Sequence, residues 1–137
     1  MKNKILLKIT AVMLIGSVTL SYSTIANAKT ASTTFGTMTY SLTKITTDSP
    51  PYKGIKASTS MPSKSKVFSY VKTTLEIQKN STGSRINKGD VKTPYTANKK
   101  VSNAIEYHGY DGIKYAAFSC HEVVGKGSHE EYLSKAY

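Results

Sequence analysis

The sequence predicts an all-β fold, a small antiparallel β-sandwich or barrel of about six or seven strands. About a quarter of residues 29–137 are Ser or Thr and nine are Tyr, which favour strands, whereas the helix formers Ala, Leu and Glu are scarce. Apolar and polar residues alternate with a period of two, the spacing of a half-buried strand. Turn residues separate these stretches roughly every 8–14 residues, which is typical of antiparallel sandwiches and barrels.

Residues 1–28 have the three-part order of a cleavable secretory signal peptide, which is expected to be helical. Lysines open the chain, an apolar run follows at 9–20, and Ala26 and Ala28 are the small residues that a signal peptidase requires for cleavage after Ala28. The apolar run spans about 12 residues, whereas a membrane-spanning helix needs about 20. The chain is therefore expected to be secreted rather than anchored.

The exported part should consist of a flexible N-terminal tail at 29–33 and a single β domain at 34–137. Loss of the three leader lysines leaves 16 basic and 8 acidic side chains, a net charge of +8. The one cysteine, Cys120, cannot form an intramolecular disulfide, so a disulfide-free domain is expected to rely on β packing alone. The Lys-rich leader, low Arg content and missing disulfides together indicate a Gram-positive bacterial origin.

The first half of the domain contains three predicted strands. Residues 37–43 alternate strictly, residues 52–59 follow as a short edge strand, and residues 66–78 form a longer strand. Turns are predicted at 48–51, 80–84 and 87–90, where Pro, Gly, Asn and Ser gather. The side chains expected on the core faces of the first and third strands are Met38, Tyr40, Leu42, Val67, Val71, Leu75 and Ile77.

The second half is predicted to contain three further strands. Residues 99–108 place Val101, Ile105 and Tyr107 on one face. A hairpin connection at 109–112 should lead into residues 113–124, the most apolar strand and the predicted centre of the sheet. Residues 128–137 then form the last strand.

The turn between these last two strands fixes a predicted register. Gly125 and Lys126 suit a two-residue turn of type II′, in which Gly comes first. A loop longer by one residue would set Glu122 against Glu130, a like-charge pair that costs stability. The two-residue turn instead sets His121 opposite Glu130, Glu122 opposite His129, and Phe118 opposite Leu133.

The same hairpin concentrates the residues that could bind a metal ion. In the predicted register each face offers about two ligands, fewer than a zinc site normally needs. The sequence therefore favours two cross-strand His–carboxylate pairs, which would stabilise protonated imidazoles, and we expect no metal and no cofactor. The candidate ligands are His121, His129, Glu122, Glu130 and Glu131.

An enzyme is not expected. Cys120 and His121 are neighbours on a strand, so their side chains point to opposite faces and cannot form a thiolate–imidazolium pair. Cys120, which shares its face with Ala116 and Phe118, is interpreted as a small core residue. There is no Gly-rich elbow for an oxyanion hole and no recognisable pair of catalytic carboxylates. A small secreted hydrolase remains an alternative.

Interleaved Tyr and Lys residues instead suggest a binding function. A Lys-rich surface suits diffuse attraction to polyanions rather than specific recognition of nucleic acid. We expect a secreted, non-enzymatic monomer, held outside the cell on an anionic cell-wall polymer or membrane surface. Lys53 and Lys56, on the predicted edge strand, would discourage pairing with another chain. The candidate surface residues are Tyr52, Lys53, Tyr70, Lys72, Lys114, Tyr115, Lys135 and Tyr137.

In outline the chain resembles small secreted β-sandwich proteins of Gram-positive bacteria, lactococcin-like bacteriocins among them. The shared features are a signal peptide, about 100 exported residues, no disulfide, a basic charge and a Thr- and Tyr-rich composition. This resemblance implies an alternative function as a bacteriocin or toxin-like effector that acts on a competitor's cell envelope. It rests on no motif, so it assigns no site residues.

Overall fold

The computed structural model describes residues 21–23, 28–47, 52–110 and 114–137. These residues form nine strands and no helix, which confirms the all-β class but exceeds the predicted six or seven strands. The strands are β1 (Ser21–Ser23), β2 (Lys29–Thr33), β3 (Gly36–Thr47), β4 (Tyr52–Met61), β5 (Tyr70–Lys79), β6 (Arg85–Pro94), β7 (Val101–Tyr110), β8 (Tyr115–Val124) and β9 (Ser128–Ala136).

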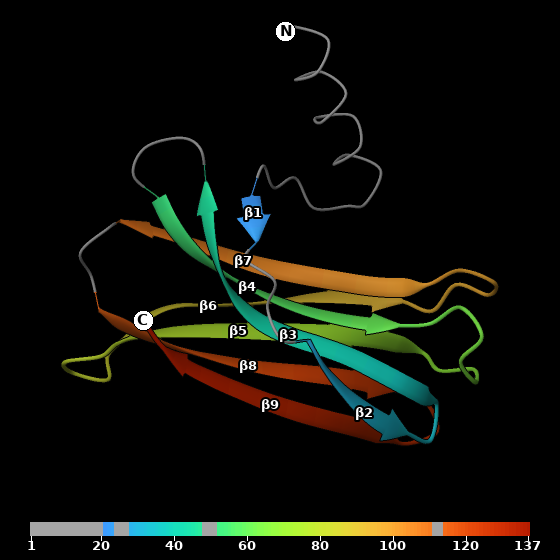
Figure 1. Cartoon of the computed structure of the whole chain (residues 1–137). Coiled ribbons are helices and arrows are strands. Elements are labelled where there is room, and N and C mark those ends of the chain that lie inside the picture. The colour runs from blue at the N-terminus through green and yellow to red at the C-terminus, as the bar shows by residue number, and fades with distance from the viewer. Residues whose placement is uncertain (1–20, 24–27, 48–51, 111–113) are drawn as a thin grey trace, which may run out of the picture.

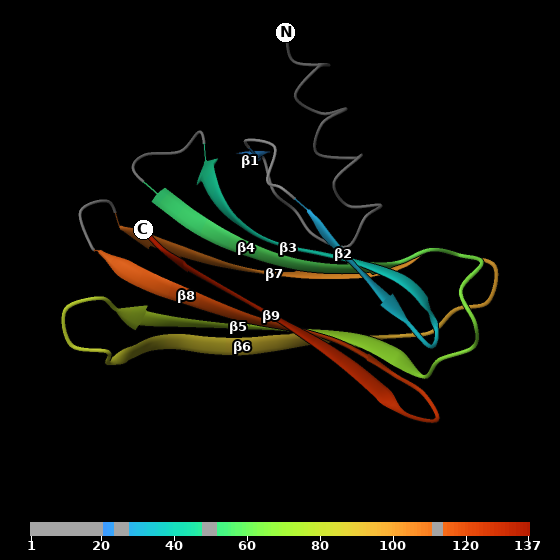
Figure 2. The ribbon, with the colours of Figure 1, turned by 60° about the horizontal axis from the view of Figure 1, so that its bottom comes forward.

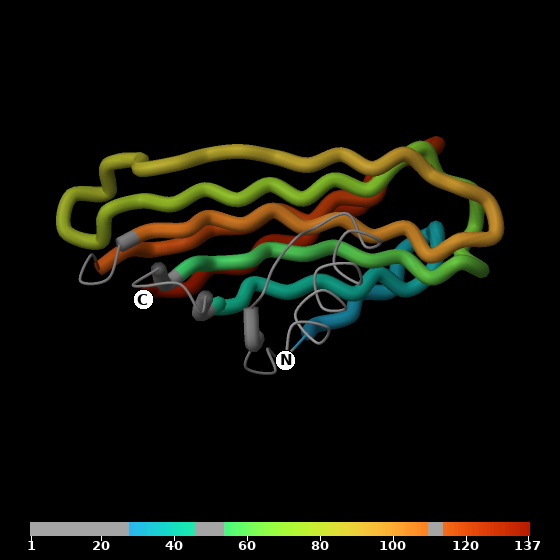
Figure 3. The backbone as a smooth tube through the Cα atoms, turned by 90° about the horizontal axis from the view of Figure 1, so that it is seen from above, coloured from blue at the N-terminus to red at the C-terminus, as the bar shows by residue number. Residues whose placement is uncertain are grey.

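The strands form two antiparallel sheets that lie one above the other (Figures 1 and 2). Sheet A has the order β3-β4-β7, and both β1 and β2 pair with the other edge of β3. Sheet B has the order β6-β5-β8-β9. Viewed from above, the long strands of both sheets run lengthwise and most of their connections gather at two ends (Figure 3). The arrangement is two packed layers.

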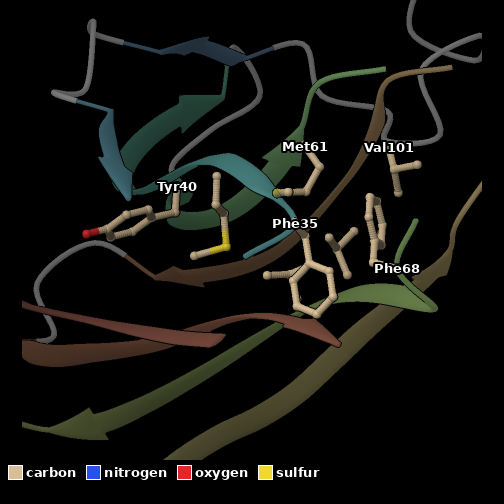
Figure 4. Close-up of a cluster of buried hydrophobic side chains, with 8 residues drawn as sticks. Phe35, Tyr40, Met61, Phe68 and Val101 are labelled. Atoms are coloured by element: carbon tan, nitrogen blue, oxygen red, sulfur yellow. The ribbon is translucent and has the colours of Figure 1, made fainter. Parts of the chain in front are cut away.

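The core lies between the sheets and is built by the alternating residues. Figure 4 shows Tyr40 and Met61 from sheet A and Phe68, which precedes β5, within one buried cluster. A second cluster includes Leu42, Ile55 and Ile77. The predicted core faces of 37–43 and 66–78 are thus confirmed, with one exception. Val67 precedes β5 and is 77% exposed.

Three predicted segments have a different structure. Residues 29–33, expected as a tail, form β2, because Thr33 Oγ1 both donates to the Gly36 carbonyl and accepts from the Phe35 N–H, which closes a tight turn into β3. The strand at 52–59 is β4, an interior strand rather than an edge. Residues 87–90, predicted as a turn, lie inside β6, whereas the turn at 80–84 is confirmed and contains Gly83 at φ 68°.

The prediction of a hairpin connection at 109–112 is wrong. β7 pairs with β4 in sheet A, whereas β8 pairs with β5 and β9 in sheet B. The chain therefore passes from one sheet to the other between these strands, and residues 111–113 lie outside the described part. Within the predicted strand 113–124, residues Tyr115–Val124 form β8, and its predicted central position is confirmed because it has a partner on each side.

The predicted register of the last hairpin is also wrong. Val124 pairs with Ser128 across a three-residue connection, so Glu122 faces Glu130, His121 faces Glu131 and Ser119 faces Leu133. The physical reason is that successive side chains of a strand alternate between its two faces, with a period of two residues. The predicted register would have paired the core face of β8 with the outer face of β9. The like-charge pair is tolerated because Lys72 lies 3.7 Å from Glu122 and the Tyr132 hydroxyl donates to Glu130.

The predicted signal peptide falls largely outside the described residues. Ser21–Ser23 form β1 beside β3, Ala28 is exposed, and Ala26 is not described. Secretion and cleavage after Ala28 therefore stay predictions. Among the described residues, no helix is long and apolar enough to cross a membrane.

Candidate anionic-surface interface

Polar side chains are buried between the two sheets in one hydrogen-bonded chain. Thr59 of β4 lies 2.6 Å from Thr73 of β5, Oγ1 to Oγ1, and the Thr73 hydroxyl donates to the Asn103 amide oxygen. The Asn103 amide nitrogen donates to the carbonyls of Val71 and Val91, at 2.9 and 3.0 Å. Because each member has a partner, the network links the sheets without leaving buried polar groups unpaired.

His121 continues this network on the core face of β8. Its Nδ1 lies 2.9 Å from Thr59 Oγ1 and its Nε2 lies 2.8 Å from Ser119 Oγ, while the Tyr40 ring packs at 5.2 Å between centroids. The side chain is fully buried, and this burial lowers the pKa of His121 to about 4, against the opposing effects of the Ser58 backbone and the Glu131 charge. The expectation of stabilised protonated imidazoles is therefore wrong for His121, which is a neutral core residue.

The other metal-ligand candidates are divided between two faces. His129 and Glu131 share the face of His121, with His129 Nε2 2.9 Å from Glu131 Oε1, and Glu131 also accepts from the Tyr40 hydroxyl at 3.1 Å. Glu122 and Glu130 lie on the outer face of sheet B. In the part of the chain that the structure describes, no group of three or more His, Cys, Asp or Glu side chains is placed to hold a metal ion.

Cys120 lies on the outer face of sheet B, opposite Tyr132, and not in the core as interpreted from the sequence. The core face of this strand is not the one with Ala116, Phe118 and Cys120 but the one that carries Tyr115, Ala117 and Val123. Partial burial, with the charges of nearby carboxylates, raises the pKa of the Cys120 thiol. The thiol is therefore held in its protonated, less nucleophilic form.

The Tyr and Lys candidates do not form one surface. Tyr70 and Lys72 lie on the outer face of sheet B, where Lys72 pairs with Asp90 and Glu122 at 3.4 and 3.7 Å and the Lys92 ammonium lies 3.9 Å from the Tyr70 ring centroid. Tyr115 is 5% exposed and belongs to the core. Lys114 is exposed beside it.

The remaining candidates lie toward the opposite end of the sandwich from the β8–β9 turn. Lys135 is exposed, with its ammonium 5.5 Å from the ring centroid of the half-buried Tyr137. Tyr52 and Lys53 belong to β4, and their side chains lie outside the described part.

The structure instead gathers lysines that the sequence analysis did not single out. Four connecting segments meet at one end of the sandwich, on the right in Figure 1: 34–35, 62–69, 95–100 and 125–127. All carboxylates of the described residues belong to strands, and none lies in these segments. The exposed lysines of this end, here called the basic end, are Lys64, Lys66, Lys99, Lys100 and Lys126.

The basic end is held together by hydrogen bonds between its segments. Lys66 N donates to the Phe35 carbonyl at 2.8 Å, Ser69 N to that of Val124 at 2.6 Å, and Tyr95 N to that of Ser69 at 2.9 Å. Beneath them Phe68 packs edge-on against both Phe35 and Tyr95, at 6.4 and 4.6 Å between ring centroids. The lysine-bearing segments are therefore braced against one another and against the core.

Three strand lysines, Lys56, Lys72 and Lys88, differ from those of the basic end in having acidic partners. Lys56 lies 3.0 Å from Glu106, and Lys88 lies 3.6 Å from Glu76. No ion pair in the described part of the chain involves a lysine of the basic end. The five lysines therefore raise the local positive potential, which Glu122 and Glu130, beside the β8–β9 connection, lower in part.

Comparison with models of known protein families gives no match to this chain, and searches of curated proteins and of solved structures give none either.

Proposed function

We propose that this protein is a secreted, non-enzymatic β domain that associates with an anionic extracellular surface such as the bacterial cell wall. The observation that carries the proposal is the basic end, where five exposed lysines stand on braced loops without a carboxylate among them. Lysine ammonium groups are mobile point charges, which suit a polymer or surface with many anionic groups better than a single shaped ligand.

The rest of the surface supports a binding role over a catalytic one. Most described carboxylates are engaged in ion pairs or hydrogen bonds. The hydrogen bond from Gln78, followed by the nearby Arg85 and Lys88, lowers the pKa of Glu76. The Cys120 thiol is held protonated, and His121 is enclosed in the core. The engagement of these groups in packing and pairing supports a binding role.

Binding to purified Gram-positive cell walls tests the proposal. The protein should sediment with walls that carry their anionic polymer, less with walls stripped of it, and should be released as NaCl approaches about 0.5 M because salt screens the attraction. Two variants remove the same amount of charge from different places. The basic-end triple variant is Lys66→Gln, Lys99→Gln and Lys100→Gln; the control triple variant is Lys44→Gln, Lys79→Gln and Lys114→Gln.

The two variants should distinguish an effect of the charge at the basic end from an effect of the net charge of the protein. Each lowers the net charge by three, so an effect of net charge alone would be equal in both. We expect the basic-end triple variant to lose affinity for walls about 10- to 100-fold and the control only a few-fold, since each lysine near an anionic surface contributes about 1 kcal/mol. Equal losses, or binding that salt does not weaken, would contradict the proposal.

A further inference from the structure

The basic end also presents an apolar side chain. Val67 is 77% exposed, one of three large hydrophobic side chains exposed in the described part of the chain, and it directly follows Lys66. The other two, Phe118 and Tyr132, lie away from this end on the outer face of sheet B. Pro62 and Ala97 of the basic end are exposed as well.

The exposure of Val67 is fixed by its neighbours. Phe68 is 2% exposed and anchored between Phe35 and Tyr95, while the backbone on either side is tied down by the Lys66 and Ser69 hydrogen bonds. Val67 therefore cannot turn into the core without breaking these contacts. Covering an apolar side chain that is held in water with the apolar surface of a partner lowers the free energy of the system.

An anionic bilayer fits this combination of groups better than a polymer in water. A polyanion offers charge for the lysines but nothing for Val67, whereas a bilayer offers anionic headgroups with hydrocarbon directly beneath them. Lysine side chains reach headgroups while their apolar stems lie along the interface. We propose that the basic end seats on an anionic phospholipid bilayer, with its lysines at headgroup level and Val67 at the acyl boundary.

This inference rests on the proposed function and narrows the partner from anionic surfaces in general to a bilayer. Vesicles of phosphatidylglycerol in phosphatidylcholine test it, beside pure phosphatidylcholine vesicles and immobilised inorganic polyphosphate, a polyanion without an apolar layer. Val67→Ser is the test variant. Phe118→Ser is its matched control, because Phe118 is also an exposed large hydrophobic side chain, 42% exposed, but lies outside the basic end.

Val67→Ser should weaken binding to the anionic vesicles about three- to tenfold and leave binding to polyphosphate unchanged, as expected for losing the burial of a few methyl groups. Phe118→Ser should change neither, and pure phosphatidylcholine should bind weakly. An unchanged vesicle affinity for Val67→Ser, or equal weakening toward polyphosphate, would overturn the bilayer inference while leaving the proposed function standing. If the basic-end triple variant binds polyphosphate and vesicles as the unmodified protein does, the proposed function fails as well.

Discussion

The imidazole Nδ1 of His121 lies 2.9 Å from the Thr59 hydroxyl oxygen, and this contact joins the two sheets through the middle of the core. A histidine enclosed in this way makes the stability of the sandwich depend on pH. The surrounding groups are Tyr40 from β3, Thr73 from β5, Ser119 of its own strand, and Glu131 from β9, whose charge raises the imidazole pKa but does not outweigh burial.

Stability should fall as the solution is acidified through the range in which the unfolded chain, but not the folded one, binds a proton at His121. Burial lowers the pKa of His121 from 6.5 to about 4. Its contribution is therefore fully present above about pH 6.5 and is lost as pH falls toward 4, a change of about 3 kcal/mol in the free energy of unfolding. Urea unfolding between pH 7.5 and 4 measures this. A His108→Gln variant, which changes an exposed histidine, should keep the dependence.

Removal of one hydroxyl from the buried network should cost more than removal of a similar hydroxyl outside it. Thr73→Val leaves the Asn103 amide oxygen without its donor and removes one of the two hydrogen-bond partners of Thr59, so it should lower the free energy of unfolding by about 1–3 kcal/mol. Thr74→Val, on the opposite face of the same strand, should change it by less than about 0.5 kcal/mol. Thermal or urea denaturation of both variants makes the comparison, and equal effects would mean that the network is dispensable.

The register of β8 and β9 can be tested through the native thiol. Cys120 faces Tyr132, whereas a two-residue turn would set it opposite Glu131. Tyr132→Cys should form a disulfide with Cys120 under mild oxidation, because opposed side chains lie about 4.5–5.5 Å apart at Cβ. Glu131→Cys points toward the core and should remain reduced. Thiol titration and mass spectrometry distinguish the two, and the reverse pattern would reinstate the shorter turn.

The packing beneath the basic end depends on a glycine. A Cβ added at Gly125 would lie 2.5 Å from the Phe35 ring and 3.2 Å from the Phe68 backbone, whereas one added at Gly127 would meet nothing within 4 Å. Gly125→Ala should therefore destabilise the protein by about 1–3 kcal/mol through overpacking. Gly127→Ala, in the same turn, should be close to neutral. Melting temperatures of the pair provide the measurement.

The sequence predicted the fold class and the core faces of several strands because alternation is a local signal, as at Met38, Tyr40 and Leu42. It did not predict which strands share a sheet, since the passage from β7 to β8 depends on partners far along the chain. The predicted hairpin register is wrong because the charge of Glu122 is offset by Lys72, a neighbour only in the folded sheet.

The candidate site was missed for a similar reason. Lys66, Lys99 and Lys126 come from three separate connections, and no local pattern joins them before the sandwich brings these connections to one end. One signal was present in the sequence. The segments 62–69, 95–100 and 125–127 each contain lysine and no acidic residue.

The most direct test of the account is a lysine footprint on the bound protein. Acetylation of lysines, read by mass spectrometry, would be compared for the free protein and for the protein bound to anionic vesicles or to cell walls. The account predicts that Lys64, Lys66, Lys99, Lys100 and Lys126 become protected, while Lys44, Lys79 and Lys114 react as in the free protein. Protection of Lys44, Lys79 and Lys114 with the basic end still reactive, or uniform protection of all eight, would contradict it.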